Sequence, residues 1–283
     1  MLVPANERQE VTQSMVSERV SQRVFLGVSA LLFVASAAVT IVWCASMSAM
    51  GEMPMPGGWT MSMAWMRMCG QTWSHAAASF IGMWVAMMVA MMLPSLAPML
   101  WRYRQAVSRT NGTGPGLMTA MVGIGYFTVW AVFGMVAFAL GSALAALEMR
   151  IPALARTVPI VSGVVVLIAG ALQFTAWKAH HLACCRVTPG HGCRVQGLQA
   201  LQTDTRSAWR HGLRLGLHCG TCCAGLTAVL LVIGVMDLRA MAAVTAVITV
   251  ERLAPEGERV ARAFGTVVVV AGLVMLVRAM GLG

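Results

Sequence analysis

The sequence predicts an all-α protein whose helices form a polytopic transmembrane bundle with six to seven spans. Hydrophobic residues make up 58% of the chain, charged residues make up only 11%, and the mean hydropathy is +0.75. Soluble globular proteins carry about 25% charged residues. Several charge-free runs also reach the roughly 20 residues that are needed to cross a hydrocarbon core. The bilayer is therefore the expected environment of most of the surface.

The apolar runs divide the chain into an N-terminal tail and one helical domain. Residues 1–23 are polar with nearly balanced charges, so we expect a short cytoplasmic tail, and residues 24–283 form the membrane domain. The expected spans are approximately 24–45, 75–93, 116–147, 158–177, 215–236, 240–254 and 263–280. The sixth span is the shortest, and whether it crosses fully is left open, because its apolar run ends at Glu251 and Arg252.

The basic residues predict the orientation of the chain. The net charge is +10, and the basic side chains concentrate in short segments between apolar runs, which is typical of membrane orientation and not of nucleic-acid binding. The segments that follow the second, fourth and sixth spans hold most of them: Arg102, Arg104, Arg109; Lys178, Arg186, Arg194, Arg206, Arg210, Arg214; Arg252, Arg259, Arg262. By the positive-inside rule these segments are cytoplasmic. We therefore expect a bacterial inner-membrane protein with its N-terminus inside and its C-terminus outside.

Six of the eight cysteines lie between Cys184 and Cys223, together with several histidines. Thiolate and imidazole are ligands that zinc and copper prefer. On a helix, residues three or four positions apart share one face. The two groups of ligands are therefore each expected on one face of a helix, at the ends of two different helices. The predicted metal ligands are His181, Cys185, Cys219, Cys222 and Cys223, with His180, Cys184 and His218 as secondary candidates. Tetrahedral Zn(II) would use four ligands, whereas Cu(I) would use two or three.

Methionines form a second sulfur-rich pattern. In the second span they fall at helical spacing along adjacent stripes: Met83, Met87, Met91 and Met88, Met92. Such a stripe is either a path for a soft ion or tight packing near a kink at Pro94. Eight more methionines occupy residues 47–68, expected outside the membrane, where they either capture copper or form a flexible interfacial loop.

Two cysteines and one glutamate each have two possible interpretations. Cys44 and Cys69 lie near the outer ends of the first two spans, where they either form a disulfide or, for Cys44, pack as a small apolar residue. Glu251 ends an apolar segment, a costly place for a carboxylate. It either orients a ligand histidine or pairs with Arg252 or with lipid headgroups.

Three segments resemble the family of predicted metal-binding integral membrane proteins known as domain of unknown function 2182. They are residues 83–98, with Trp84 to Pro94 as the conspicuous motif, residues 173–186 and residues 212–251, and the similarity covers Trp73 to Phe264. The resemblance implies a membrane fold and metal binding. The family's pattern is kept at Gln173, Lys178, Cys185, Cys219, Cys222, Cys223 and Glu251, and Gln173, Lys178 and Glu251 are then expected around the ligands. His181 stands where the family usually has a cysteine, which changes the ligand type.

The sequence favours a protein that handles a soft metal such as copper, by transport, delivery or sensing. Its expected partners are the lipid bilayer and a metallochaperone or a membrane complex, and no nucleic acid. Two alternatives remain: a membrane enzyme that cycles the cysteine pairs between thiol and disulfide, and a structural subunit of a larger membrane complex. The sequence contains no P-loop, so nucleotide-driven pumping by this chain is not expected.

Overall fold

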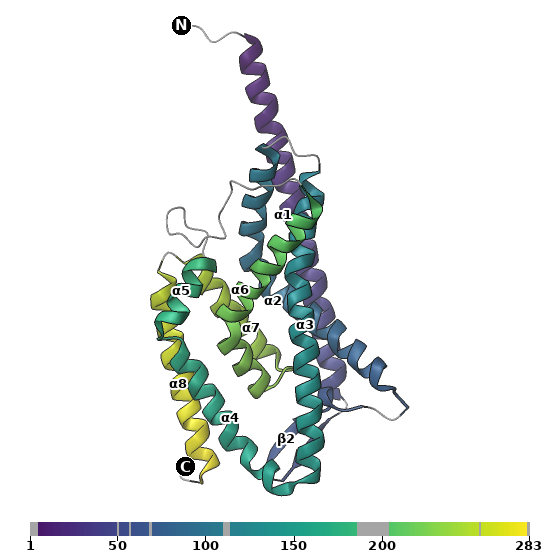
Figure 1. Cartoon of the computed structure of the whole chain (residues 1–283), viewed down its shortest axis with the longest axis vertical. Coiled ribbons are helices and arrows are strands. Elements are labelled where there is room, and N and C mark those ends of the chain that lie inside the picture. Colours follow the sequence, from purple (N-terminus) through teal and green to yellow (C-terminus); the bar gives the residue numbers. More distant parts are fainter. Residues whose placement is uncertain are drawn as a thin grey trace.

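The computed structural model of the chain is a helical bundle with one small hairpin (Figure 1). It describes residues 5–49, 51–56, 58–67, 70–109, 114–185, 204–254 and 256–281. The described helices are α1 (Ala5–Ala49), α2 (Trp73–Arg109), α3 (Pro115–Arg150), α4 (Pro152–Leu172), α5 (Ala176–Cys185), α6 (Thr205–Ile233), α7 (Leu238–Leu253) and α8 (Gly257–Ala279). Among them α1, α2, α3, α4, α6 and α8 are long and apolar enough to cross a membrane. The all-α fold class is confirmed.

Several helices are longer than the apolar runs that predict them. Residues 5–23, part of the expected polar tail, are helical and belong to the same helix that continues through the first span to Ala49. No glycine or proline interrupts residues 5–23, so no residue in that stretch ends the helix. On the neighbouring helix, Gln105 donates a 3.0 Å hydrogen bond to Glu18 and so fixes this extension against the end of α2.

Close helix contacts set the packing of the bundle. Helices α3 and α6 run parallel, and a Cβ atom on Gly212 would overlap the backbone carbonyl of Val122. Helices α4 and α8 run antiparallel, with Gly163 against Leu276 and Gly272 against Leu167. Small residues of this kind allow membrane helices to approach through backbone contact. The parallel α3–α6 pair matters most here, because it aligns the two helices that carry much of the site.

Helix α7 corresponds to the weak sixth span. It has 16 residues, fewer than a full crossing requires, and it is not among the six helices long enough to span. In Figure 1, the N-terminal end of α1 and the C-terminal end of α8 lie at opposite ends of the bundle, and α7 runs back beside α6 toward the start of α8. A short helix therefore reverses the chain, and its last turn carries Glu251 and Arg252.

The methionine-rich segment is folded. Strands β1 (Glu52–Met55) and β2 (Trp59–Ser62) form an antiparallel hairpin, followed by the 3-10 helix η1 (Met63–Trp65). Met55 and Met61 are buried against Ala145 of α3 and Ala155 of α4. The indole nitrogen of Trp59 donates a 2.9 Å hydrogen bond to the Ala155 carbonyl. The segment is thus attached to the bundle rather than being a loose interfacial loop, whereas the side chains of Met68 and Cys69 lie outside the described residues.

Candidate metal centre

Three cysteines of α6 point into the protein and form the core of the site. Cys219, Cys222 and Cys223 are each at most 3% exposed, and the side chain of Cys223 is in hydrogen-bond contact with those of Cys219 and Cys222. They fall on one side of α6 because positions three and four residues apart share a helix face. This part of the predicted ligand set is therefore gathered by a single helix.

The Cys219 sulfur is surrounded by strong donors. The Tyr126 hydroxyl of α3 donates to Cys219 Sγ at 2.8 Å, and the Arg252 guanidinium of α7 donates to it at 2.7 Å. Arg252 Nη2 lies 3.6 Å from Cys223 Sγ, and its Nη1 donates to Ser95 Oγ at 3.2 Å. A buried cation with sulfur acceptors on one side stabilises negative charge on those sulfurs. The arrangement is suited to thiolate chemistry.

A buried ion pair lies beside the thiols. Lys178 of α5 donates at 2.9 Å both to a Glu251 carboxylate oxygen and to the backbone carbonyl of Cys222. Burial acts to lower the pKa of Lys178, but the neighbouring Cys222 and Glu251 raise it, and the net pKa lies above its ordinary value. Glu251 thus pairs with Lys178. Gln173, the C-cap residue of α4, is also buried. Its Oε1 has no partner among the described residues.

The histidines form a separate layer where α5 meets α6. The ring centres of His181 and His218 are 6.3 Å apart, and those of His180 and His181 are 5.7 Å apart. Burial lowers the pKa of His181, and the two neighbouring imidazoles lower it further. A neutral imidazole is the form that binds metals. His218 is one helical turn from Cys222, so this layer lies next to the thiols along α6.

The methionine stripe of α2 leads to the thiols. Met83, Met87, Met88, Met91 and Met92 are all at most 3% exposed. The last of them, Met92, places its Sδ 3.9 Å from Cys219 Sγ. The stripe is held by packing around Trp84, whose indole nitrogen donates to the Trp130 carbonyl at 2.8 Å. Buried sulfur therefore continues from one helix to the next.

Part of the predicted ligand set lies at the end of α5 and in the segment after it. The backbone of α5 extends through Cys184 and Cys185, but their side chains, like all of His191 and Cys193, lie outside the described residues. Within the described part of the chain, no group of three or more His, Cys, Asp or Glu side chains is arranged to hold a metal ion. Arg252 and Tyr126 occupy two directions of approach to Cys219. Two-coordinate binding thus requires less rearrangement than a tetrahedral site.

Sequence reasoning missed the donors around Cys219. The sequence pattern indicates Arg252 as a marker of orientation and as a partner of Glu251, and it gives no sign of Tyr126 or Ser95. Tyr126 and Arg252 reach the same sulfur from α3 and α7, which are far apart in the chain. A charged residue at the end of an apolar segment is the one sequence signal that points to Arg252.

The six long apolar helices place the chain in a class of helical bundles that is consistent with a multi-pass membrane protein, and its buried sulfurs are of the type that soft metals prefer. Within this class, residues 81–275, more than half of the chain, match the family described as PpoB2, copper chaperone. The chain belongs to this copper chaperone family. The match supports the metal-related resemblance of the sequence. Comparison with curated proteins and with solved structures gives no match.

Proposed function

We propose that the protein is a bacterial inner-membrane copper chaperone that guides Cu(I) along α2 to the thiols of α6 and hands it to a partner protein. The carrying observation is the continuity of buried sulfur: the α2 stripe ends with Met92 Sδ 3.9 Å from Cys219 Sγ. Membership of the copper chaperone family supports the choice of metal. The N-terminal end of the bundle, which includes α5, is proposed to face the cytoplasm.

The two kinds of sulfur suit two different tasks. A bare cation is costly in an apolar interior unless ligands replace its water shell. Thioethers do so without charge, so they hold Cu(I) loosely enough to pass it on, whereas thiolates hold it more tightly. Movement from Met83 through Met92 to Cys219 is therefore downhill in free energy.

Arg252 keeps the thiol end electrically balanced. The Lys178–Glu251 pair is neutral as a unit, which leaves the Arg252 guanidinium as the cation beside the sulfurs. Cu(I) held by two thiolates carries one negative charge in total, and Arg252 offsets it. The same cation keeps the site weak for Zn(II), because a dication with two thiolates leaves the positive guanidinium unbalanced. The proposed cargo is thus Cu(I), with Cys219 and Cys223 as its first ligands.

Hand-over is proposed to follow the histidine layer. His218 lies one turn from Cys222, and His181 of α5 faces it, so both imidazoles lie between the thiols and the α5 end of the bundle. Neutral imidazole is an ordinary copper ligand. The acceptor is proposed to be a copper-binding protein that docks at this end, and Cys184 and Cys185 belong to the same proposed exit.

Cu(I) binding by the purified full-length protein tests the proposal. Cu(I) is titrated in detergent against a chelator of known affinity, and Cys219→Ser with Cys223→Ser is compared with the native chain. We expect the double variant to lose affinity by more than the roughly 10–100-fold that loss of an outer-shell partner costs. The matched control is Thr221→Ala, on the exposed face of the same helix, where the hydroxyl bonds only to its own helix backbone.

Two results would contradict the proposal. One is equal Cu(I) affinity in the native chain and the double variant. The other is metal-free protein in which a quinone reversibly forms a disulfide among Cys219, Cys222 and Cys223, because that result favours a thiol-redox enzyme.

A further inference from the structure

A methionine-lined cavity lies at the start of the α2 stripe, whereas the thiols lie beside Met92 at the end of that stripe. We propose that this cavity is a second Cu(I) site, an all-thioether entry site that loads the stripe. The inference rests on the proposed function, since it supplies the point at which copper joins the route. It concerns side chains other than the Cys and His ligands described above.

The cavity has a volume of about 260 Å³ and gathers methionines from separate parts of the chain. Met47 is in the last turn of α1, Met63 and Met66 belong to η1 and its C-cap, Met83 is on α2, and Met236 lies in the turn between α6 and α7. No acidic or basic side chain is among the residues that line it. Several thioethers around one space are the ligand set that selects Cu(I).

Methionines of the neighbouring hairpin provide an internal comparison. Met55 and Met61, at 8% and 3% exposed, are buried in one apolar cluster with Ala145 and Ala155, and neither lines the cavity. Protein interiors are normally packed at the density of organic crystals. A methionine that served only as filler would be expected to occupy a space such as this cavity. The cavity methionines instead surround it.

The cavity connects directly to the proposed route. Met83 lines the cavity and is also the first residue of the α2 stripe, one helical turn before Met87. Met236, another lining residue, has its Sδ 3.8 Å from the Cys44 sulfur. One residue therefore serves both the cavity and the stripe, so an ion bound there has its next ligand one turn away.

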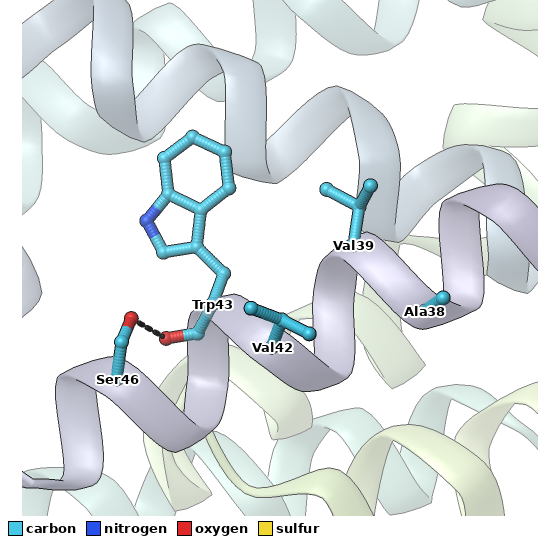
Figure 2. Close-up of a pocket in the computed structure, with 5 residues that line it drawn as sticks. All are labelled: Ala38, Val39, Val42, Trp43 and Ser46. Carbon is cyan, nitrogen blue, oxygen red and sulfur yellow. Dashed lines mark hydrogen bonds between the residues drawn. The ribbon is translucent and has the colours of Figure 1, made fainter.

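A second hollow, which shares Trp43 with the cavity, has no sulfur-containing side chain in its lining. It measures about 370 Å³ and is lined by Ala38, Val39, Val42, Trp43 and Ser46 of α1 (Figure 2). The Ser46 hydroxyl donates to the Trp43 carbonyl at 2.8 Å, so its proton is already engaged. Trp43 lines both hollows. Of the two, only the cavity is lined by sulfur, from Met47, Met63, Met66, Met83 and Met236.

Removal of the thiols makes the entry site measurable. In a full-length background with Cys219→Ser, Cys222→Ser and Cys223→Ser, the purified protein is loaded with Cu(I), and the retained copper is counted. We expect this background to retain Cu(I) with sulfur-only coordination by X-ray absorption. Addition of Met47→Leu, Met63→Leu and Met236→Leu should reduce the retained Cu(I) by one ion per chain. The matched control is Met55→Leu with Met61→Leu, which changes two packing methionines and should retain it.

Each outcome has one meaning. Equal copper retention in the cavity variant and the hairpin control overturns the entry site and leaves the proposed function standing. Unchanged Cu(I) binding on loss of the three thiols instead contradicts the proposed function. If the triple methionine variant does not elute as a folded species, single Met47→Leu and Met236→Leu variants replace it. Each single variant should weaken Cu(I) affinity at least severalfold, and unchanged affinity in both overturns the proposal.

Discussion

The two ends of the methionine stripe place sulfur in opposite electrostatic surroundings. At the thiol end, Cys219 contacts the Arg252 guanidinium, and the buried Lys178–Glu251 pair lies close by. At the thioether end, no charged side chain lines the cavity in the described part of the chain. Sulfur is common to both ends, and the charged groups distinguish them. In the proposed route, these charges decide whether Cu(I) is retained or passed on.

The largest expected effect is the loss of stability when a buried cation at the thiol end is removed, compared with removal of an exposed cation elsewhere. Lys178→Met leaves Glu251 buried without its cation, which should lower the free energy of unfolding by about 3–5 kcal/mol. Denaturation by SDS in mixed micelles measures it. The control is Arg259→Gln, which breaks a 2.6 Å pair with Glu256 whose side chains are 77% and 62% exposed, and should cost about 0–1 kcal/mol. Similar losses in both variants would remove the distinction.

The second prediction tests the helix contact that brings Tyr126 to Cys219. Gly212→Ala places a methyl group against the Val122 carbonyl, so α3 and α6 must separate at a cost of about 1–3 kcal/mol. Cu(I) affinity should fall as well. Gly123→Ala on α3 is the control, because its added methyl group meets no atom within 4 Å. Equal stability and equal Cu(I) affinity in the two variants would show that this contact does not support the thiol end.

The third prediction concerns transfer between the two ends. Met87→Leu with Met91→Leu conserves volume at a stability cost below about 1.5 kcal/mol. In reconstituted vesicles, Cu(I) supplied on the hairpin side should reach the thiols at least tenfold more slowly, a change of about 1.4 kcal/mol in the barrier. Copper–thiolate ultraviolet absorbance follows the arrival. The control is Met135→Leu with Met149→Leu, at exposed positions of α3. An unchanged arrival rate at equal protein level would assign the stripe to packing.

The smallest expected effect lies in the hairpin at the thioether end. Trp59→Phe removes the hydrogen bond to the Ala155 carbonyl, at a cost of about 0.5–1.5 kcal/mol. Limited proteolysis should then cut the hairpin faster, while Cu(I) affinity at the thiols stays constant. Unchanged proteolysis would show that packing of Met55 and Met61 alone holds the hairpin in place.

The sequence predicted the helices well and their ends poorly. Apolar runs locate the spans because burial in lipid depends on composition. They do not locate the ends of α1 and α2, because both helices continue into polar segments that contain Glu18 and Gln105. The hairpin, in contrast, has a local sequence signal. Met53 and Met55 alternate with polar or proline residues before the Gly-Gly pair at 57–58, which is typical of a turn between strands.

The site was predictable as residue types, but its pairings were not. Spacing alone places Cys219, Cys222 and Cys223 on one face of α6. The partners of Glu251 and Arg252 depend on direction around a helix, and adjacent helical residues point about 100° apart, so Glu251 reaches α5 while Arg252 reaches α6. Long-range geometry of this kind has no local pattern. The cavity methionines could not be separated from Met55 and Met61 for the same reason.

The short helix α7 also has a consequence for biosynthesis. Its apolar stretch is brief and ends in two charged residues, so by itself it has little tendency to partition into lipid. The partners described for its charges, Ser95, Lys178 and Cys219, all precede it in the chain. A ribosome therefore delivers α7 to a membrane in which these partners are already present. A chain that stops before α7 therefore lacks both Arg252 and Glu251, so Cys219 loses its guanidinium donor and Lys178 loses its carboxylate partner.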